Sequence, residues 1–207
     1  MVTNISDFCK SELARQIPGA DRKALISLLK ASYDLRNKVS LDNPVFYCTE
    51  IGSKDIQADL LRAAIAAVAV DYCSRGILPY KCCIEKNTVR NCSHVELHNN
   101  ESTIYLARTS FAGQKPKYVK YIPYNEPNLF DPVPAPEKDV ITTFLLTYGD
   151  SSTADLDFAV LGVPGSKGWY YKENLSISNA DIYTISAKEP EEMLISLIEN
   201  GAIANEQ

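Results

Sequence analysis

Apolar residues recur every three or four positions along the first third of the chain, a spacing typical of amphipathic helices. One helix is predicted over 20–36, with apolar positions at Leu25, Ile26, Leu28, Leu29 and Leu35. A shorter helix is predicted over 6–17, with Ser6 as a candidate N-cap and the Pro18-Gly19 pair at its end. A third helix, rich in alanine, is predicted over 53–73 and is expected to be central, because small side chains allow close packing on nearly all sides.

From Tyr80 onward the pattern alternates between apolar and polar positions, as it does in half-buried strands. Strands are predicted over 80–85, 94–98, 103–108, 140–148 and 157–163. The second and third of these form one predicted hairpin, and the last two form another. The stretch 115–136 holds six of the 11 prolines and has no periodicity, which indicates an irregular connection. Gly168 and Trp169 are interpreted as part of a turn.

Helices that precede strands, without alternation of the two, indicate an α+β domain with a mainly antiparallel sheet. We expect N-terminal helices over about 1–78 to pack on a sheet formed by about 79–188. A short C-terminal helix is predicted over about 190–200. A length of 207 residues fits a single domain over 1–207 with a sizeable buried core.

The composition is that of a globular protein and excludes several other classes. With 45% hydrophobic and 23% charged residues, the chain is neither disordered nor fibrous, and its longest apolar run, 63–70, is too short to span a membrane. No signal-peptide pattern is present, so we expect a soluble, cytoplasmic protein. The six cysteines all precede residue 93 without a C-x-x-C pair, which predicts reduced, mostly buried thiols.

Charge is unevenly distributed along the chain, although the net charge is only -5. Residues 1–125 hold 17 basic and 12 acidic side chains, whereas residues 126–207 hold 4 basic and 14 acidic ones. A basic part joined to an acidic part suits a polyanionic partner or an oppositely charged protein. Ordinary solvated faces would produce the same distribution.

The basic part includes a tyrosine-rich segment, 108–124, that contains no acidic residue. Its candidate binding residues are Arg108, Lys115, Lys117, Tyr118, Lys120 and Tyr121. Cationic groups bind phosphates and aromatic rings stack on bases, so the segment predicts contact with a nucleic acid or with an acidic protein partner. The alternative is that its tyrosines clamp the segment to its own domain.

Both histidines of the chain lie in one pentapeptide on a predicted strand, where alternation places His94, Glu96 and His98 on one face. Imidazole and carboxylate groups bind zinc, manganese or iron, and Glu96 can instead act as a base beside His94. Alternate residues of a strand lie ~6.6 Å apart. Further ligands would therefore come from Asp155 or Asp157, a carboxylate pair that also suits magnesium. A half-buried strand with polar residues outward gives the same pattern.

Two function classes follow from these observations. The first is an intracellular binding module without a cofactor, which uses the basic, tyrosine-rich segment to contact nucleic acid or an acidic protein. The second is a metal-dependent hydrolase or nuclease, with a divalent ion on the histidine strand and with Glu96 and His94 as catalytic residues. We favour the first, because it requires no site beyond residues that the chain plainly contains.

Overall fold

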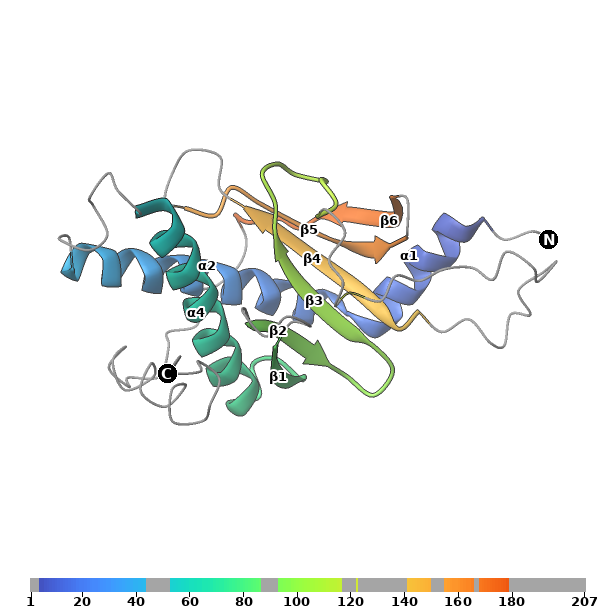
Figure 1. Cartoon of the computed structure of the whole chain (residues 1–207). Helices are drawn as coiled ribbons and strands as arrows, with labels where there is room; N and C mark the ends of the chain where they lie inside the picture. The colour runs from blue at the N-terminus through green and yellow to red at the C-terminus, as the bar shows by residue number, and fades with distance from the viewer. Residues whose placement is uncertain are drawn as a thin grey trace.

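The computed structural model describes residues 4–43, 53–86, 93–116, 122, 141–149, 155–165 and 168–178. In this part of the chain, three helices pack against a six-stranded sheet (Figure 1). The elements are α1 (Ile5–Gln16), α2 (Gly19–Asp42), α4 (Ser53–Ser74), β1 (Lys81–Lys86), β2 (Ser93–His98), β3 (Thr103–Arg108), β4 (Thr143–Gly149), β5 (Phe158–Pro164) and β6 (Trp169–Asn174). The expected α+β fold is confirmed. The C-terminal helix predicted over 190–200 lies outside the described residues.

The helix ends follow local chemistry. Helix α1 is capped by Asn4, whose side-chain oxygen accepts a hydrogen bond from the Ser6 N–H at 3.1 Å. The predicted cap at Ser6 is therefore wrong by two residues, because the asparagine already satisfies a free N–H of the first turn. Helix α4 is followed by Gly76 at a φ of 70°, and the Gly76 N–H donates to the Cys73 carbonyl at 3.1 Å. Glycine adopts this left-handed conformation without strain and so ends the helix as predicted.

The six described strands follow one another across the sheet in chain order. Each neighbouring pair is antiparallel except β3 and β4, which run parallel. The two predicted hairpins, β2 with β3 and β4 with β5, are confirmed. Because a tight turn cannot join parallel strands, the chain passes from β3 to β4 through the long connection 109–142. The sequence interpretation placed Trp169 in a turn, whereas in the structure Trp169 is the first residue of β6.

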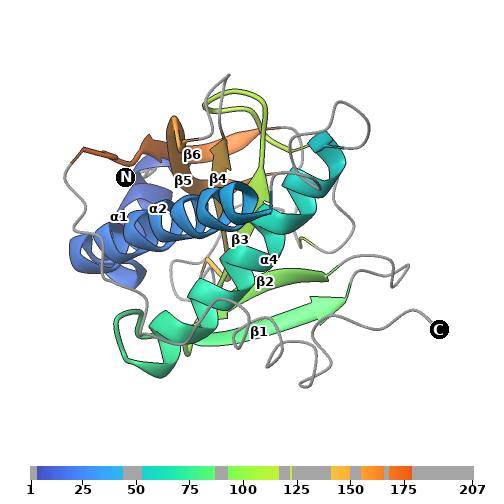
Figure 2. The ribbon, with the colours of Figure 1, turned by 90° about the vertical axis from the view of Figure 1, so that its left-hand side faces the viewer.

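Alternation along the strands gives the sheet two different faces. One face packs against the helices and forms the main core with them, through residues that include Leu28, Leu29, Ile65, Val68, Leu97, Leu106, Phe144 and Leu161. Helix α4 contacts α2, β1 and β2, and Figure 2 shows it crossing α2 in front of the sheet. It is not enclosed on nearly all sides as expected, because Ile56 and Val70 are exposed. The other face carries a smaller cluster of Tyr105, Ala107, Ile122 and Leu145, with Trp169 packed against it. Strand β4 is consequently buried along its whole length.

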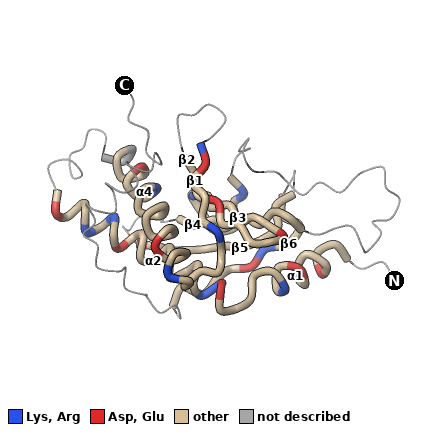
Figure 3. Tube along the Cα trace, turned by 90° about the horizontal axis from the view of Figure 1, so that it is seen from below, with Lys and Arg blue, Asp and Glu red and all other residues tan. Residues whose placement is uncertain are grey.

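The charged positions on the helices are of mixed sign. Figure 3 shows basic and acidic residues interleaved along α1 and α2. Some of them form ion pairs: an Arg15 guanidinium nitrogen lies 2.8 Å from Glu12 on the same helix and 2.5 Å from Glu101 in the turn between β2 and β3. Exposed pairs of this kind contribute little to stability. None of the helices in the described ranges is both long and apolar enough to cross a bilayer.

Candidate functional site

The polar residues of β2 form a connected row on the face of the sheet that points away from the helices. Their neighbours Val95 and Leu97 enter the main core, so His94, Glu96 and His98 project from the opposite side. The Nε2 atom of His94 lies 2.8 Å from Oε1 of Glu96, and the Nε2 atom of His98 lies 3.1 Å from Oε2 of the same carboxylate. Both imidazoles therefore converge on one carboxylate, as the alternation of the sequence allowed.

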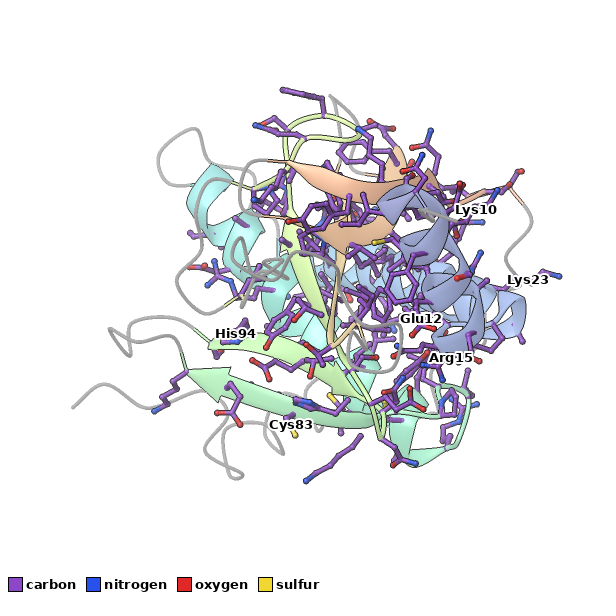
Figure 4. The ribbon with its side chains drawn as sticks, turned by 90° about the vertical axis from the view of Figure 1, so that its right-hand side faces the viewer. Lys10, Glu12, Arg15, Lys23, Cys83 and His94 are labelled. Carbon is purple, nitrogen blue, oxygen red and sulfur yellow. The ribbon has the colours of Figure 1, made fainter. Side chains whose placement is uncertain are left out.

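The neighbouring strands hold this row in place. On β3, the Thr103 hydroxyl lies 2.8 Å from Nδ1 of His98. The ring of Tyr105 stacks on His94, with centroids 6.5 Å apart and planes inclined by 26°. On β1, Cys83 is the backbone partner of Glu96, and Figure 4 labels it together with His94. In a neutral His98, Nε2 donates to the carboxylate and Nδ1 accepts from the Thr103 hydroxyl, which fixes the orientation of the ring.

The arrangement differs from the predicted metal site. In the described part of the chain, no group of three or more His, Cys, Asp or Glu side chains is arranged to hold a metal ion. The two histidine nitrogens face different oxygens of Glu96, whereas ligands of one ion must face a common point. Asp155 lies beside α2, where the Asn37 amide donates to it at 3.4 Å. The sheet thus separates Asp155 from the histidine row.

Asp155 also influences a carboxylate of α2. Burial of Asp34 and, to a smaller degree, the negative charge of Asp155 raise the pKa of the Asp34 carboxyl, while Lys30 lowers it. The second predicted carboxylate, Asp157, donates its backbone N–H to the Gly149 carbonyl at 3.0 Å and so extends the pairing of β4 with β5. The structure therefore brings together His94, Glu96 and His98, and it does not place either aspartate with them in a metal site.

Tyr105 links the histidine row to the apolar cluster of its face. Burial raises the pKa of Tyr105 to about 12, and the charge of Glu96 contributes to the increase. In the unfolded chain a tyrosine loses its proton near pH 10. Below that pH the phenol is protonated in both states, whereas between pH 10 and 12 only the unfolded chain releases the proton. Stability associated with Tyr105 is therefore present below pH 10 and lost as the pH rises toward 12.

Tyr105→Phe is expected to reduce the sensitivity of the fold to alkali. Between pH 8 and pH 11, the wild-type protein should lose about 1 kcal/mol more of its free energy of unfolding than the variant does. Urea denaturation at the two pH values measures this difference, because the contributions of the other tyrosines cancel. Identical losses in the two proteins would show that Tyr105 titrates normally in the folded state.

The predicted basic segment is described in part. Arg108 is exposed at the end of β3. The ammonium group of Lys115 donates to the Gly165 carbonyl, and burial lowers the pKa of Lys115. Lys115 is thus tied to its own domain, whereas the tyrosines of the clamp alternative, Tyr118, Tyr121 and Tyr124, lie outside the described residues. The other four predicted binding residues, Lys117, Tyr118, Lys120 and Tyr121, lie outside the described residues.

The loop after β3 packs against β6, a contact that the sequence did not reveal. The Trp169 indole N–H donates to the Gly113 carbonyl at 3.1 Å, and the Lys172 ammonium lies 3.3 Å from the same oxygen. Beside this anchor, the Phe111 side chain is 61% exposed. We refer to Phe111, Lys115, Trp169 and Lys172 as the loop surface. The contact could not be predicted, because no periodic pattern relates residues so far apart in the chain. The segment 108–124, singled out from the sequence, does contain Phe111 and Lys115.

Comparison with known proteins adds no assignment. No protein-family model, no curated protein and no solved structure matches this chain. A function is therefore inferred from the chemistry of its own residues. Two sites invite that inference: the histidine row, whose polar groups bind one another, and the loop surface, whose aromatic ring faces solvent.

Proposed function

We propose that this chain is a non-catalytic binding module that uses the loop surface to bind single-stranded nucleic acid. The observation that carries the proposal is the exposure of Phe111 on a loop whose Gly113 carbonyl is contacted by the exposed Lys172. Most large apolar side chains of the described residues are buried, so an exposed ring held on an anchored loop is a candidate contact. Single-strand binders combine aromatic rings, which stack on bases, with cations that follow the phosphates.

The anchoring of the loop supports this role. Trp169 and Lys172 both donate to the Gly113 carbonyl, and Gly113 itself has a φ of 77°, which favours glycine. The turn that carries Phe111 is therefore fixed to the edge strand β6, so little conformational entropy is lost when a base stacks on the ring. Arg108, immediately before the loop, adds an exposed positive charge. The proposal extends on sequence grounds to Lys117, Tyr118, Lys120 and Tyr121.

Binding of a labelled single-stranded oligonucleotide of about 12 nucleotides tests the proposal. Phe111→Ala is expected to weaken binding by about 5-fold to 150-fold, equivalent to 1–3 kcal/mol, with little change in salt dependence. Lys172→Ala should instead reduce the slope of log affinity against log salt by roughly 0.7. Fluorescence anisotropy over a series of salt concentrations measures both quantities.

Two variants at the end of α2 serve as matched controls. Leu41→Ala removes an apolar side chain that is 77% exposed, and Lys38→Ala removes an exposed charge. Neither should change the affinity beyond the general effect of net charge. If no oligonucleotide binds at low ionic strength, the proposal is wrong. Binding of polyglutamate in its place, with the same dependence on Phe111 and Lys172, would identify an acidic protein as the partner class.

A further inference from the structure

Cys73 and Cys82, which have eight residues between them, lie close together at the connection between α4 and β1. Cys73 lies in the last turn of α4, and Cys82 is the second residue of β1. The chain reverses between them at Gly76, and both side chains pack, half-buried, against the main core. Their thiols are in hydrogen-bond contact. Neither residue is in a disulfide, so the structure shows the reduced form of the pair.

The surroundings make the two thiols unequal. The Cys73 sulfur is the acceptor for the Cys82 thiol and for the backbone N–H of Tyr80, and these donors lower the pKa of Cys73 in spite of its burial. The contact with Cys73 and burial raise the pKa of Cys82. For comparison, burial raises the pKa of Cys9 to about 11. Cys73 is therefore the better nucleophile of the pair.

Cys83 is next to Cys82 in the sequence but lies on the other face of the sheet. Cys82 is opposite Leu97, which is in the main core, whereas Cys83 is opposite Glu96, which is in the histidine row. Consecutive strand residues point to opposite faces. Cys73, which belongs to the helix layer, therefore has Cys82 within reach and not Cys83. This difference gives the chain a matched internal control.

We infer that Cys73 and Cys82 form a reversible thiol-modification site that reacts with small disulfides of the glutathione class. The Cys73 thiolate attacks one sulfur of oxidised glutathione, a new S–S bond forms, and one glutathione thiolate leaves and takes up a proton. Cys82 then loses its proton and attacks the Cys73 sulfur of this mixed disulfide. The Cys73–Cys82 disulfide forms and the second glutathione leaves as a thiol. Two electrons pass from the protein dithiol to glutathione disulfide, and reduced glutathione reverses both steps.

Peptide mapping of the full chain after incubation with oxidised glutathione tests the inference. Cleavage after lysine and arginine places Cys73 in the peptide 63–75, and places Cys82 with Cys83 in the peptide 82–86. We expect these two peptides to become linked and then to separate on addition of reduced glutathione. At short times and neutral pH, we expect Cys73 to react about tenfold or more faster than Cys9, whose thiol is 1% exposed.

Serine variants distinguish the two neighbouring cysteines. Cys83→Ser should still form the linked peptides, whereas Cys82→Ser should stop at the mixed disulfide, with glutathione retained on Cys73. Circular dichroism shows whether each variant is folded. The relative reaction rates of Cys73 and Cys9 in the wild-type chain test the inference without any variant. A linked product that persists in Cys82→Ser, or a Cys73 that reacts no faster than Cys9, would overturn the inference.

Discussion

Replacement of Phe144 by alanine is expected to lower the free energy of unfolding by about 3–5 kcal/mol. Phe144 lies on β4, is 0% exposed, and belongs to the core between the sheet and the helices. Its truncation removes apolar contacts and leaves a cavity that the flanking strands on both sides keep from closing. Because a domain is stable by only about 5–15 kcal/mol, the loss is large. Urea denaturation followed by circular dichroism measures it.

Phe111→Ala is the matched control for this change. It removes the same side chain from a position that is 61% exposed, so the free energy of unfolding should change by no more than about 0.5 kcal/mol. Equal losses from the two variants would contradict the assignment of Phe144 to the core and Phe111 to the surface. A folded Phe111→Ala that no longer binds an oligonucleotide would separate the proposed function from stability.

Gly162→Ala is expected to destabilise the protein by about 1–3 kcal/mol. A Cβ at this position of β5 would lie 2.3 Å from the Tyr171 carbonyl oxygen and 2.9 Å from the Lys172 Cα. Both atoms belong to the backbone of β6, which cannot move aside as a side chain can. The pairing of β5 with β6 must therefore separate. Thermal denaturation measures the loss, and oligonucleotide binding should weaken as well, because β6 carries Lys172.

Gly168→Ala provides the comparison at the start of β6. Apart from its two neighbours in the chain, no described residue has an atom within 4 Å of a Cβ built on Gly168, and its backbone is not in the left-handed region. The melting temperature of this variant should stay close to that of the wild type. A similar loss in both variants would mean that the contact across β5 and β6 is not the cause.

The parts of the fold that depend on local sequence were predictable. The turn between β2 and β3 is an example: the Asn99 side-chain oxygen accepts from the N–H groups of Glu101 and Ser102 at 2.8 and 2.6 Å, as turn-forming asparagine does. Gly76 likewise ended a helix where expected. The parallel pairing of β3 with β4 was not predictable. Periodicity indicates local structure, and it does not show which distant segments of the chain pair with each other.

The candidate sites divide in the same way. Alternation alone placed His94, Glu96 and His98 on one face, and their mutual contacts follow from that placement. Asp155 precedes β5 and lies beside α2, on the helix side of the sheet. The alternation of residues along a strand does not specify on which side of the sheet a residue before the strand lies. The contact of Cys73 with Cys82 depends on how α4 packs on β1, and a search for C-x-x-C spacing cannot detect it.

The parallel junction between β3 and β4 has a consequence for the newly synthesised chain. Strands β1 to β3 pair antiparallel from contacts that are close in sequence, so they can associate as soon as they leave the ribosome. Until β4 follows, however, β3 is an open edge with unpaired backbone groups and with the apolar side chains of Ile104 and Leu106. Such an edge pairs readily with another chain. Synthesis of 109–149 is thus an interval in which the nascent protein is exposed to aggregation.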